Sequence, residues 1–217
     1  MLSHVEDNIQ IAATQYRPKF TAFLDERQRA LVSQYAAALT PLPCMFWGGY
    51  EQAQRVVFGV FDEYSQPQGE EFPIDLVFFQ FRKQDKLSHR DFLGSMMGQL
   101  IKRETIGDIC IQEGRAMVAC LKSVTPLLLE ITKIGRWGVK PSLGGQDPIV
   151  PKQEYETIQG TVASNRLDAV VALALHQSRE NCQKFIQQGL VALNYEICQN
   201  NAQELNENDC LSIRGHG

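Results

Sequence analysis

The sequence predicts an α+β protein in three parts: a helical N-terminal segment, a central sheet domain and a small C-terminal domain. Three observations support this prediction. Apolar residues recur at helical spacing at the start, strand-like and helix-like runs alternate in the middle, and a segment rich in proline and glycine precedes the last part. The expected boundaries are residues 1–40 for the helical segment, 41–141 for the central domain, 142–160 for a linker and 161–217 for the C-terminal domain.

The N-terminal segment is predicted to form two helices followed by a hairpin. Helical spacing extends from about residue 7 to 16 and again from 20 to 39, and Pro18 separates the two runs. The strand-like runs CMFWGGY and RVVFGVF then lie around Gly48 and Gly49, which is typical of a hairpin or a bulged turn. We expect this hairpin to join the sheet of the central domain.

The central part predicts six further elements. Their expected order is strand (74–81), helix (88–101), strand (107–112), strand (116–121), helix (125–134) and strand (137–140). This β-α-β-β-α-β order is the ferredoxin-like arrangement, which RNA-recognition modules share with many unrelated enzymes. The architecture alone therefore names no function.

The charge of the chain is unevenly distributed. The formal net charge of −4 at pH 7 argues, taken alone, against a general nucleic-acid binder. Residues 1–80 contain 5 Lys and Arg against 10 Asp and Glu, whereas residues 81–140 contain 11 against 6. A polyanion is therefore expected to favour the middle of the chain.

Composition and motifs exclude several classes of protein. Hydrophobic residues make up 44% and charged residues 21% of the 217 residues, and no apolar run approaches the ~20 residues that span a membrane. The first residues lack the charged and apolar regions of a secretory signal, so we expect a cytoplasmic protein without disulfides. The six cysteines contain no CxxC pair, and no phosphate-loop, dinucleotide-binding or metal-ligand spacing occurs. No cofactor and no metal are expected.

The last part of the chain predicts two helices and two short strands. The helices are expected at 166–175 and 178–188, followed by Gly189 at a left-handed cap. The strands are expected at 190–194 and 210–214, and the polar turn NENDC lies before the second.

Three strings of this part resemble the alpha-L RNA-binding domain, the fold named after small-subunit ribosomal protein S-four. They are RLDAVV, SRENCQKFIQQGLVALN and LNENDCLSIRG, and the resemblance covers residues 164–217. It implies RNA contacts from the positions that are often basic in the family, which are Arg166, Arg179, Lys184 and Arg214. It also implies contacts from Ser178 at a helix start and from Asn194 at a strand end. Glu180, Gln187 and Gln188 depart from the basic pattern of the family. With 4 Lys and Arg against 6 Asp and Glu in residues 161–217, we expect this domain alone to bind RNA weakly. A solvated surface charge is the alternative for each arginine.

The RLD motif also carries the catalytic aspartate of pseudouridine synthases. Here Asp168 opens a helix instead of lying in a sheet-bound catalytic domain, and the helix dipole favours an anion at this place. Short motifs outside their structural context are mostly chance matches. We therefore assign Asp168 no catalytic role.

The basic middle contains further candidate RNA contacts. Lys86, His89 and Arg90 place positive charge beside the start of the helix expected at 88–101. The helix dipole makes such charge mildly unfavourable unless an anion also binds there. A phosphate site at this helix start is the resulting hypothesis.

Two further pairs of cations lie later in the basic middle. Lys102 and Arg103 follow the predicted helix, where capping and solubility are the alternative interpretation. Arg136 and Lys140 bracket Trp137. An aromatic side chain between cations on a sheet could stack a base, but a core position is the favoured interpretation for Trp137.

Longer strings resemble the YlmH-type proteins, which are encoded near bacterial division genes and end in the alpha-L domain. The strings are HRDFLGSMMGQLIKRETIGDI, GGYEQAQR and KIGRWGVK, and the resemblance spans about residues 15–217. It implies a non-enzymatic RNA-binding protein of the large ribosomal subunit that acts in the rescue of stalled translation, with a further link to cell division. The expected partners are ribosomal RNA and, as a second candidate, tRNA, without DNA or a membrane. We expect a monomer.

Two other classes of function stay open. An RNA-modifying enzyme would use His89 and Asp91 as acid and base or Cys120 as a nucleophile, but no set of nucleophile, base and orienting group is visible. A protein-interaction adaptor in cell division would use the acidic first 80 residues, which are otherwise a solvated face.

Overall fold

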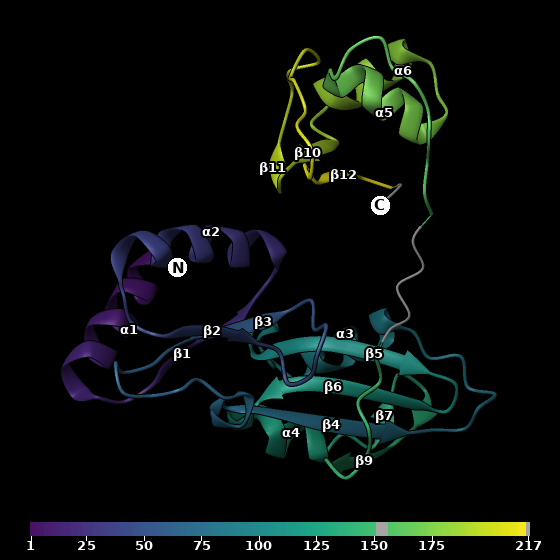
Figure 1. Ribbon diagram of the computed structural model, residues 1–217. Helices are drawn as coiled ribbons and strands as arrows, with labels where there is room; N and C mark the ends of the chain where they lie inside the picture. The colour runs from purple at the N-terminus through teal and green to yellow at the C-terminus, as the bar shows by residue number, and fades with distance from the viewer. Residues whose placement is uncertain (151–155, 216–217) are drawn as a thin grey trace. The chain divides into compact units, whose positions relative to one another are not determined.

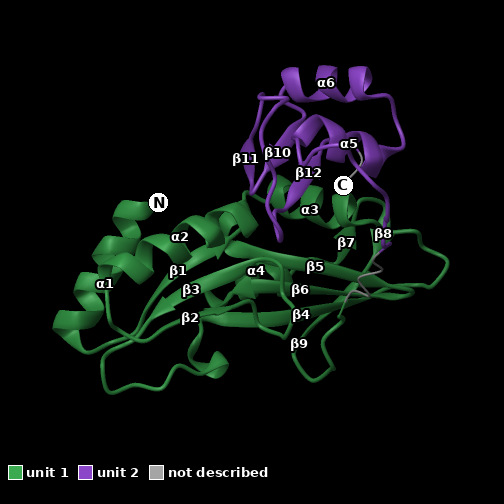
Figure 2. Ribbon diagram, turned by 45° about the horizontal axis from the view of Figure 1, so that its top comes forward, with its two compact units in different colours: residues 1–152 green, residues 153–217 purple. Residues whose placement is uncertain are grey.

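The computed structural model describes residues 1–150 and 156–215. The chain forms two compact units, residues 1–152 and 153–217, which Figure 2 distinguishes by colour. Helices and strands occur in both units (Figure 1), and the predicted α+β class is confirmed. Within the described residues, no helix has the length and apolar character needed to cross a membrane.

The N-terminal part of the first unit is a three-stranded antiparallel sheet with two helices. Its elements are α1 (Leu2–Gln15), β1 (Lys19–Leu24), α2 (Glu26–Leu39), β2 (Cys44–Trp47) and β3 (Val56–Val60), and the strand order is β1-β3-β2. Val5 of α1 and Val32 of α2 share one buried core with Phe58 of β3. Both helices therefore pack on this sheet (Figure 1).

The helix predicted over residues 20–39 is wrong in its first part. Residues 19–24 form β1, which pairs with β3, and α2 begins only after Asp25. The Asp25 carboxylate accepts a hydrogen bond from Gln28 N at 2.8 Å, and Gln28 Oε1 accepts one from Asp25 N at 2.9 Å. This reciprocal capping box fixes the helix start, and the run before it is left free to pair as a strand.

β2 and β3 form the predicted hairpin, but the expectation that they join the central sheet is wrong. β3 pairs with β2 along one edge and with β1 along the other. All five residues of β3 are buried. Because both edges of β3 already have partners, this strand cannot extend the central sheet.

The central sheet has the predicted β-α-β-β-α-β order. Its elements are β4 (Ile74–Gln80), α3 (His89–Gly98), β5 (Ile106–Gln112), β6 (Arg115–Leu121), α4 (Thr125–Leu129) and β9 (Lys140–Leu143), with short 3₁₀ helices η1 (Gly69–Glu71), η2 (Arg103–Thr105) and η3 (Lys122–Val124). All neighbouring strands are antiparallel, in the order β5-β6-β4-β9. β4 and β6, the first and third strands of the β-α-β-β-α-β order, thus form the centre of the sheet, as expected of a ferredoxin-like arrangement.

The last elements of the central domain are shorter than predicted. The helix expected over residues 125–134 ends at Leu129, because a small hairpin follows it. The hairpin strands are β7 (Lys133–Ile134) and β8 (Trp137–Gly138). The strand expected at 137–140 is therefore divided, with Trp137 in the hairpin and Lys140 at the start of β9.

The two faces of the central sheet are both covered. Helices α3 and α4 pack on the face that carries Phe79. On the opposite face, Phe78 and Met117 are fully buried in a cluster with Tyr50 and Ile149. RNA-recognition modules stack bases on exposed aromatic side chains of such a sheet. Here Phe78 and Met117 on that face are buried, so they are not available for such stacking.

The C-terminal unit is a pair of helices with a small antiparallel sheet. Its elements are α5 (Leu167–Leu175), α6 (Arg179–Gln187), β10 (Val191–Leu193), β11 (Glu196–Ile197) and β12 (Leu211–Ile213), in the strand order β11-β10-β12. Val171, Cys182 and Ile186 are buried where the two helices meet the sheet. Gly189 has a φ of +69°, as expected of the predicted left-handed cap, whereas β11 is a strand that the sequence did not predict.

Candidate nucleic-acid interface

The C-terminal unit arranges two arginines around one buried carboxylate. Asp168 lies in the first turn of α5, and its side chain is fully buried. Its Oδ1 atom accepts hydrogen bonds from Arg179 Nη2 at 2.9 Å and Arg166 Nε at 3.2 Å. Its Oδ2 atom accepts hydrogen bonds from Gln183 Nε2 at 2.8 Å and Arg166 Nη2 at 3.2 Å. Arg166 and Arg179 stand at the starts of α5 and α6 with side chains 39% and 45% exposed.

The ionisation of Asp168 holds this arrangement together. Burial by itself would raise the pKa of the carboxyl group, but the hydrogen bonds from Arg179, Gln183 and Arg166 outweigh that effect and hold the pKa well below its usual value. Asp168 is therefore a positioning residue that fixes two guanidinium groups at neighbouring helix starts, where backbone N–H groups favour anions. The predicted contacts Arg166 and Arg179 are brought together. Gln183 lies one helical turn after Arg179, on the edge of α6 that the helical spacing predicts as a contact line, and it joins the same cluster.

The other predicted residues of this unit have separate positions. Ser178 caps α6 by accepting a backbone hydrogen bond at 3.3 Å. Lys184 Nζ lies 3.1 Å from the carboxylate of Glu180. The side chain of Asn194 is hydrogen-bonded to the turn before β12 at 2.8 and 2.9 Å, and Arg214 is exposed just after β12. Ser178 and Asn194 therefore have structural partners, and their contacts to RNA stay predictions.

A small cavity in the first unit gathers the predicted residues His89 and Arg103 with Arg55, which was not predicted. Its volume is about 160 Å³. The carbonyl oxygen of Ile106 accepts hydrogen bonds from Arg103 Nη1 at 2.6 Å and from Arg55 Nε at 3.1 Å. Partial burial, followed by the charge of Arg103, lowers the pKa of His89. His89 is thus mostly neutral at pH 7 and offers an N–H donor instead of a cation.

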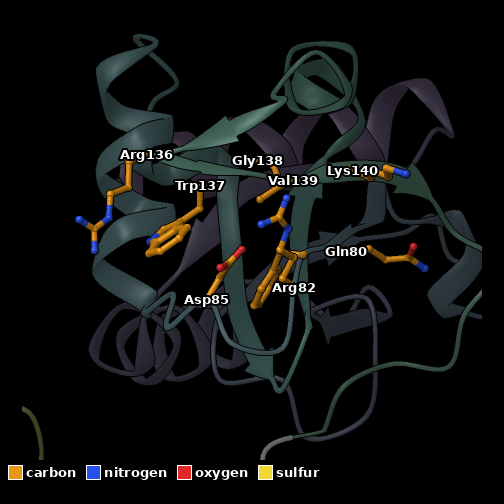
Figure 3. Close-up of a pocket in the computed structure, with 9 residues that line it drawn as sticks. Gln80, Arg82, Asp85, Arg136, Trp137, Gly138, Val139 and Lys140 are labelled. Atoms are coloured by element: carbon orange, nitrogen blue, oxygen red, sulfur yellow. The ribbon is translucent and has the colours of Figure 1, made fainter.

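A larger cavity, of about 780 Å³, lies beside the end of β4 (Figure 3). The predicted residues Arg136 and Lys140 line it together with Arg82 and Asp85, which were missed. Trp137 also lines it, and Arg136 Cζ lies 4.6 Å from the centroid of the Trp137 ring. Trp137 packs partly against the core, as the favoured interpretation expects, and it also borders the cavity, while stacking of a base stays a prediction.

Three further predicted residues, Lys86, Arg90 and Lys102, are exposed and line neither cavity. At the start of α3, Ser88 N and Oγ donate hydrogen bonds to Asp91 Oδ2 at 2.8 and 2.6 Å. This carboxylate already supplies negative charge to the helix start. A phosphate site at this position stays a prediction.

The residues considered for catalysis are not arranged for it. Cys120 is fully buried in β6, where burial raises the pKa of its thiol to about 12. A buried protonated thiol is a poor nucleophile at neutral pH. His89 lines the small cavity, whereas Asp91 is hydrogen-bonded to Ser88, so these two side chains have separate surroundings.

Two domain families match parts of this chain. Residues 67–143 match the family described as "Putative RNA-binding domain in YlmH", and residues 165–210 match the S4 domain. The first match includes the larger cavity, and the second includes the Asp168 cluster. Both matches are to RNA-binding domains and neither is to a catalytic family.

Whole-chain comparisons extend these matches. The chain is 33% identical over 213 residues to the ribosome-associated protein quality control protein P2 of Bacillus subtilis (strain 168), and the alignment covers 96% of this chain and 82% of that protein. The solved structure of the cell division protein ylmH from Streptococcus pneumoniae has a similar fold, with a TM-score of 0.58 and 23% identity over 66% of this chain and 88% of that one. The predicted membership is thereby confirmed: the chain belongs to the YlmH family.

Proposed function

We propose that this chain binds ribosomal RNA on the large ribosomal subunit and acts, without catalysis, in the rescue of stalled translation. The matched RNA-binding domains support an RNA ligand, and the name of the Bacillus subtilis relative supports a role on the ribosome. The observation that carries the RNA contact is the pair Arg166 and Arg179, which the buried Asp168 holds at two helix starts. Such a protein works in the cytoplasm as a monomer, with a ribosome-bound tRNA as its second RNA ligand.

The Asp168 cluster favours phosphate recognition. A guanidinium group presents a planar fork of N–H donors that matches a phosphate, and a group already held in place loses less conformational freedom on binding. The carboxylate engages only some of these donors, and both arginine side chains remain about 40% exposed. The outward donors are thus available to an RNA backbone.

A second contact is needed because the C-terminal unit is mildly acidic. Residues 161–217 carry 4 Lys and Arg against 6 Asp and Glu, and affinity for an RNA backbone depends on the number of phosphates neutralised. Residues 81–140 supply the complementary basic region. Two weak sites on one chain reinforce each other through their effective concentration.

Sedimentation of the tagged full chain in a lysate gradient tests this proposal. We expect migration with the large ribosomal subunit at low salt, and release at raised salt because counterions compete for the phosphates. The variant with Arg166→Gln and Arg179→Gln, checked by hydrogen exchange for a folded C-terminal unit, is expected to bind more weakly. The slope of log affinity against log salt should fall by about one for each arginine removed. Arg27→Gln on α2 is the matched control, because this exposed arginine is not among the predicted RNA contacts.

The other outcomes are decisive as well. Migration as a free protein in every condition would contradict ribosome binding. Association that survives nuclease treatment would instead support a protein partner and the alternative adaptor function. A light-scattering mass of twice the chain would contradict the monomer.

A further inference from the structure

The larger cavity of the first unit has the dimensions of a ligand site. Its volume of about 780 Å³ lies within the range of about 300–1,000 Å³ typical of small-ligand pockets. It lies where β4 ends and β9 begins, so its walls come from the β4–α3 loop and the β7–β8 hairpin. Unlike the closed face of the sheet, this end is open.

One wall of the cavity carries a buried carboxylate, Asp85, with one oxygen atom that has no partner among the described residues. Asp85 is only 5% exposed, and its Oδ1 atom has no hydrogen-bond partner among the residues that the structure describes. Figure 3 shows its carboxylate directed between Trp137 and Arg82. A buried acceptor without a donor is costly, so each such group in a folded protein calls for a missing partner. A ligand with N–H groups would supply it.

The rest of the lining is aromatic and positively charged. Arg136 stacks on Trp137 at 4.6 Å, which gives the cavity a broad flat surface of the kind on which bases stack. Arg82 and Lys140 lie at the same cavity, and neither forms an ion pair among the described residues. The site thus combines an acceptor, a stacking surface and unpaired cations, which are the three groups needed for a base with its phosphates.

We propose that this cavity binds a single unpaired guanine nucleotide of an RNA strand. This inference rests on the proposed function, because the strand is the RNA that the chain binds. Guanine presents two neighbouring donors, N1–H and N2–H₂, on its Watson–Crick edge, and an ionised carboxylate is an acceptor only. The corresponding edges of adenine, cytosine and uracil each place an acceptor beside the donor, which Asp85 would repel. In the bound state, Asp85 accepts both guanine N–H groups, the Arg136–Trp137 stack contacts the base, and Arg82 and Lys140 contact its phosphates.

Fluorescence anisotropy with labelled oligouridine tests the site in the full chain. The probes are strands of equal length with a central guanosine, adenosine or inosine, measured at low salt. We expect the guanosine strand to bind roughly tenfold more tightly than the adenosine strand, as for other bidentate base contacts. Inosine lacks the N2 amino group and should fall between the two. Asp85→Asn is expected to abolish the preference for guanosine. The affinity for plain oligouridine should not fall, because the uracil edge gains nothing from the Asp85 carboxylate.

Two further variants separate the parts of the site. Glu71→Gln makes the same acid-to-amide change at an exposed residue before the opposite end of β4, and it should leave the preference intact. Trp137→Ala should weaken all strands by about tenfold through lost stacking. Because Trp137 also packs on the core, its result counts only if the melting temperature is retained. Asp85→Asn removes no packing contact and keeps the test decisive.

The outcomes distinguish this inference from the proposed function. The guanine site would be overturned if the guanosine and adenosine strands bound equally tightly and Asp85→Asn had no effect. Water alone would then supply the hydrogen bond to Asp85. RNA binding would then stand on the Asp168 cluster. Competition by free GMP as strong as by the strand would overturn the assignment to an RNA strand. Failure of every strand to bind, together with free migration in the ribosome gradient, would reject both proposals.

Discussion

Each unit of this chain buries at least one aspartate, and the carboxylates of Asp168 and Asp85 have opposite surroundings. Asp168 is fully buried and accepts hydrogen bonds from two arginines and a glutamine. Asp85 is 5% exposed, and its Oδ1 atom has no partner among the described residues. A buried carboxylate with all its hydrogen bonds stabilises a fold. One that lacks a hydrogen bond destabilises the fold until a ligand or water donates it. The comparison separates a carboxylate that organises a surface from one that is available to a ligand.

The largest expected effect is the loss of the satisfied carboxylate. Asp168→Asn should lower the free energy of unfolding of the C-terminal unit by about 2–3 kcal/mol, since it removes the charge that two arginines share. The value lies below that of a fully buried pair because Arg166 and Arg179 remain partly hydrated. Hydrogen exchange with mass spectrometry in urea, read on peptides from residues 164–215, measures this change unit by unit.

Glu207→Gln, an exposed acid-to-amide change in the same unit, is the control and should lie within about 0.5 kcal/mol of the wild type. A loss of the same size in both variants would show that the Asp168 cluster contributes no more than a surface charge. Peptides from the first unit should keep their protection in both variants.

A pH series sharpens the comparison further. The pKa of Asp168 is depressed in the folded state, so its stabilisation is fully present above the unfolded value of about 3.9 and is lost as the pH falls below it. The difference between wild type and Asp168→Asn should therefore be constant from pH 7 to about pH 5 and should shrink steadily in more acidic solution. Unfolding free energies of both proteins across this range provide the measurement. A difference that disappeared already above pH 5 would contradict the depressed pKa.

The third prediction is an increase in the free energy of unfolding, where the first was a decrease. Asp85→Asn should raise the free energy of unfolding of the first unit by about 1 kcal/mol, because it removes a buried charge whose Oδ1 atom has no donor among the described residues. Hydrogen exchange of peptides from residues 74–121 measures it. A clear destabilisation would mean that Asp85 has an essential partner in the free protein, and the contrast with Asp168 would fail.

The sequence predicts best where local pattern and tertiary packing agree. The central strands are continuous apolar runs separated by turns, so their order could be predicted, and the long strings of the C-terminal unit indicate its family. Residues 19–24 show the opposite case. Their apolar spacing suits a helix as well as a strand, and only pairing with β3 decides the outcome.

The candidate sites could be predicted only in part. The cations were identified individually, but their grouping depends on contacts between distant segments. Asp168 meets Arg179 and Gln183 because α5 and α6 pack together, and no local pattern contains that contact. Asp85 resembles an ordinary turn residue, and only the fold places it with the β7–β8 hairpin in the lining of one cavity. Ile149 was expected in a linker, yet it helps to close the sheet face beside Phe78.

The smallest expected effect concerns the exposed ion pair on α6. Lys184 and Glu180 are 3.1 Å apart, with side chains 59% and 80% exposed, whereas Arg179 on the same helix pairs with a fully buried carboxylate. Glu180→Gln should therefore change the free energy of unfolding by no more than about 0.5 kcal/mol. The effect of Glu180→Gln on RNA affinity should be larger, because the substitution frees Lys184 and removes a negative charge beside the Arg166–Arg179 pair. We expect a several-fold rise in RNA affinity at low salt that disappears at high salt, where such charges are screened. Anisotropy titrations at two salt concentrations measure it, and a rise that persisted at high salt would show that Glu180 acts through structure instead of charge.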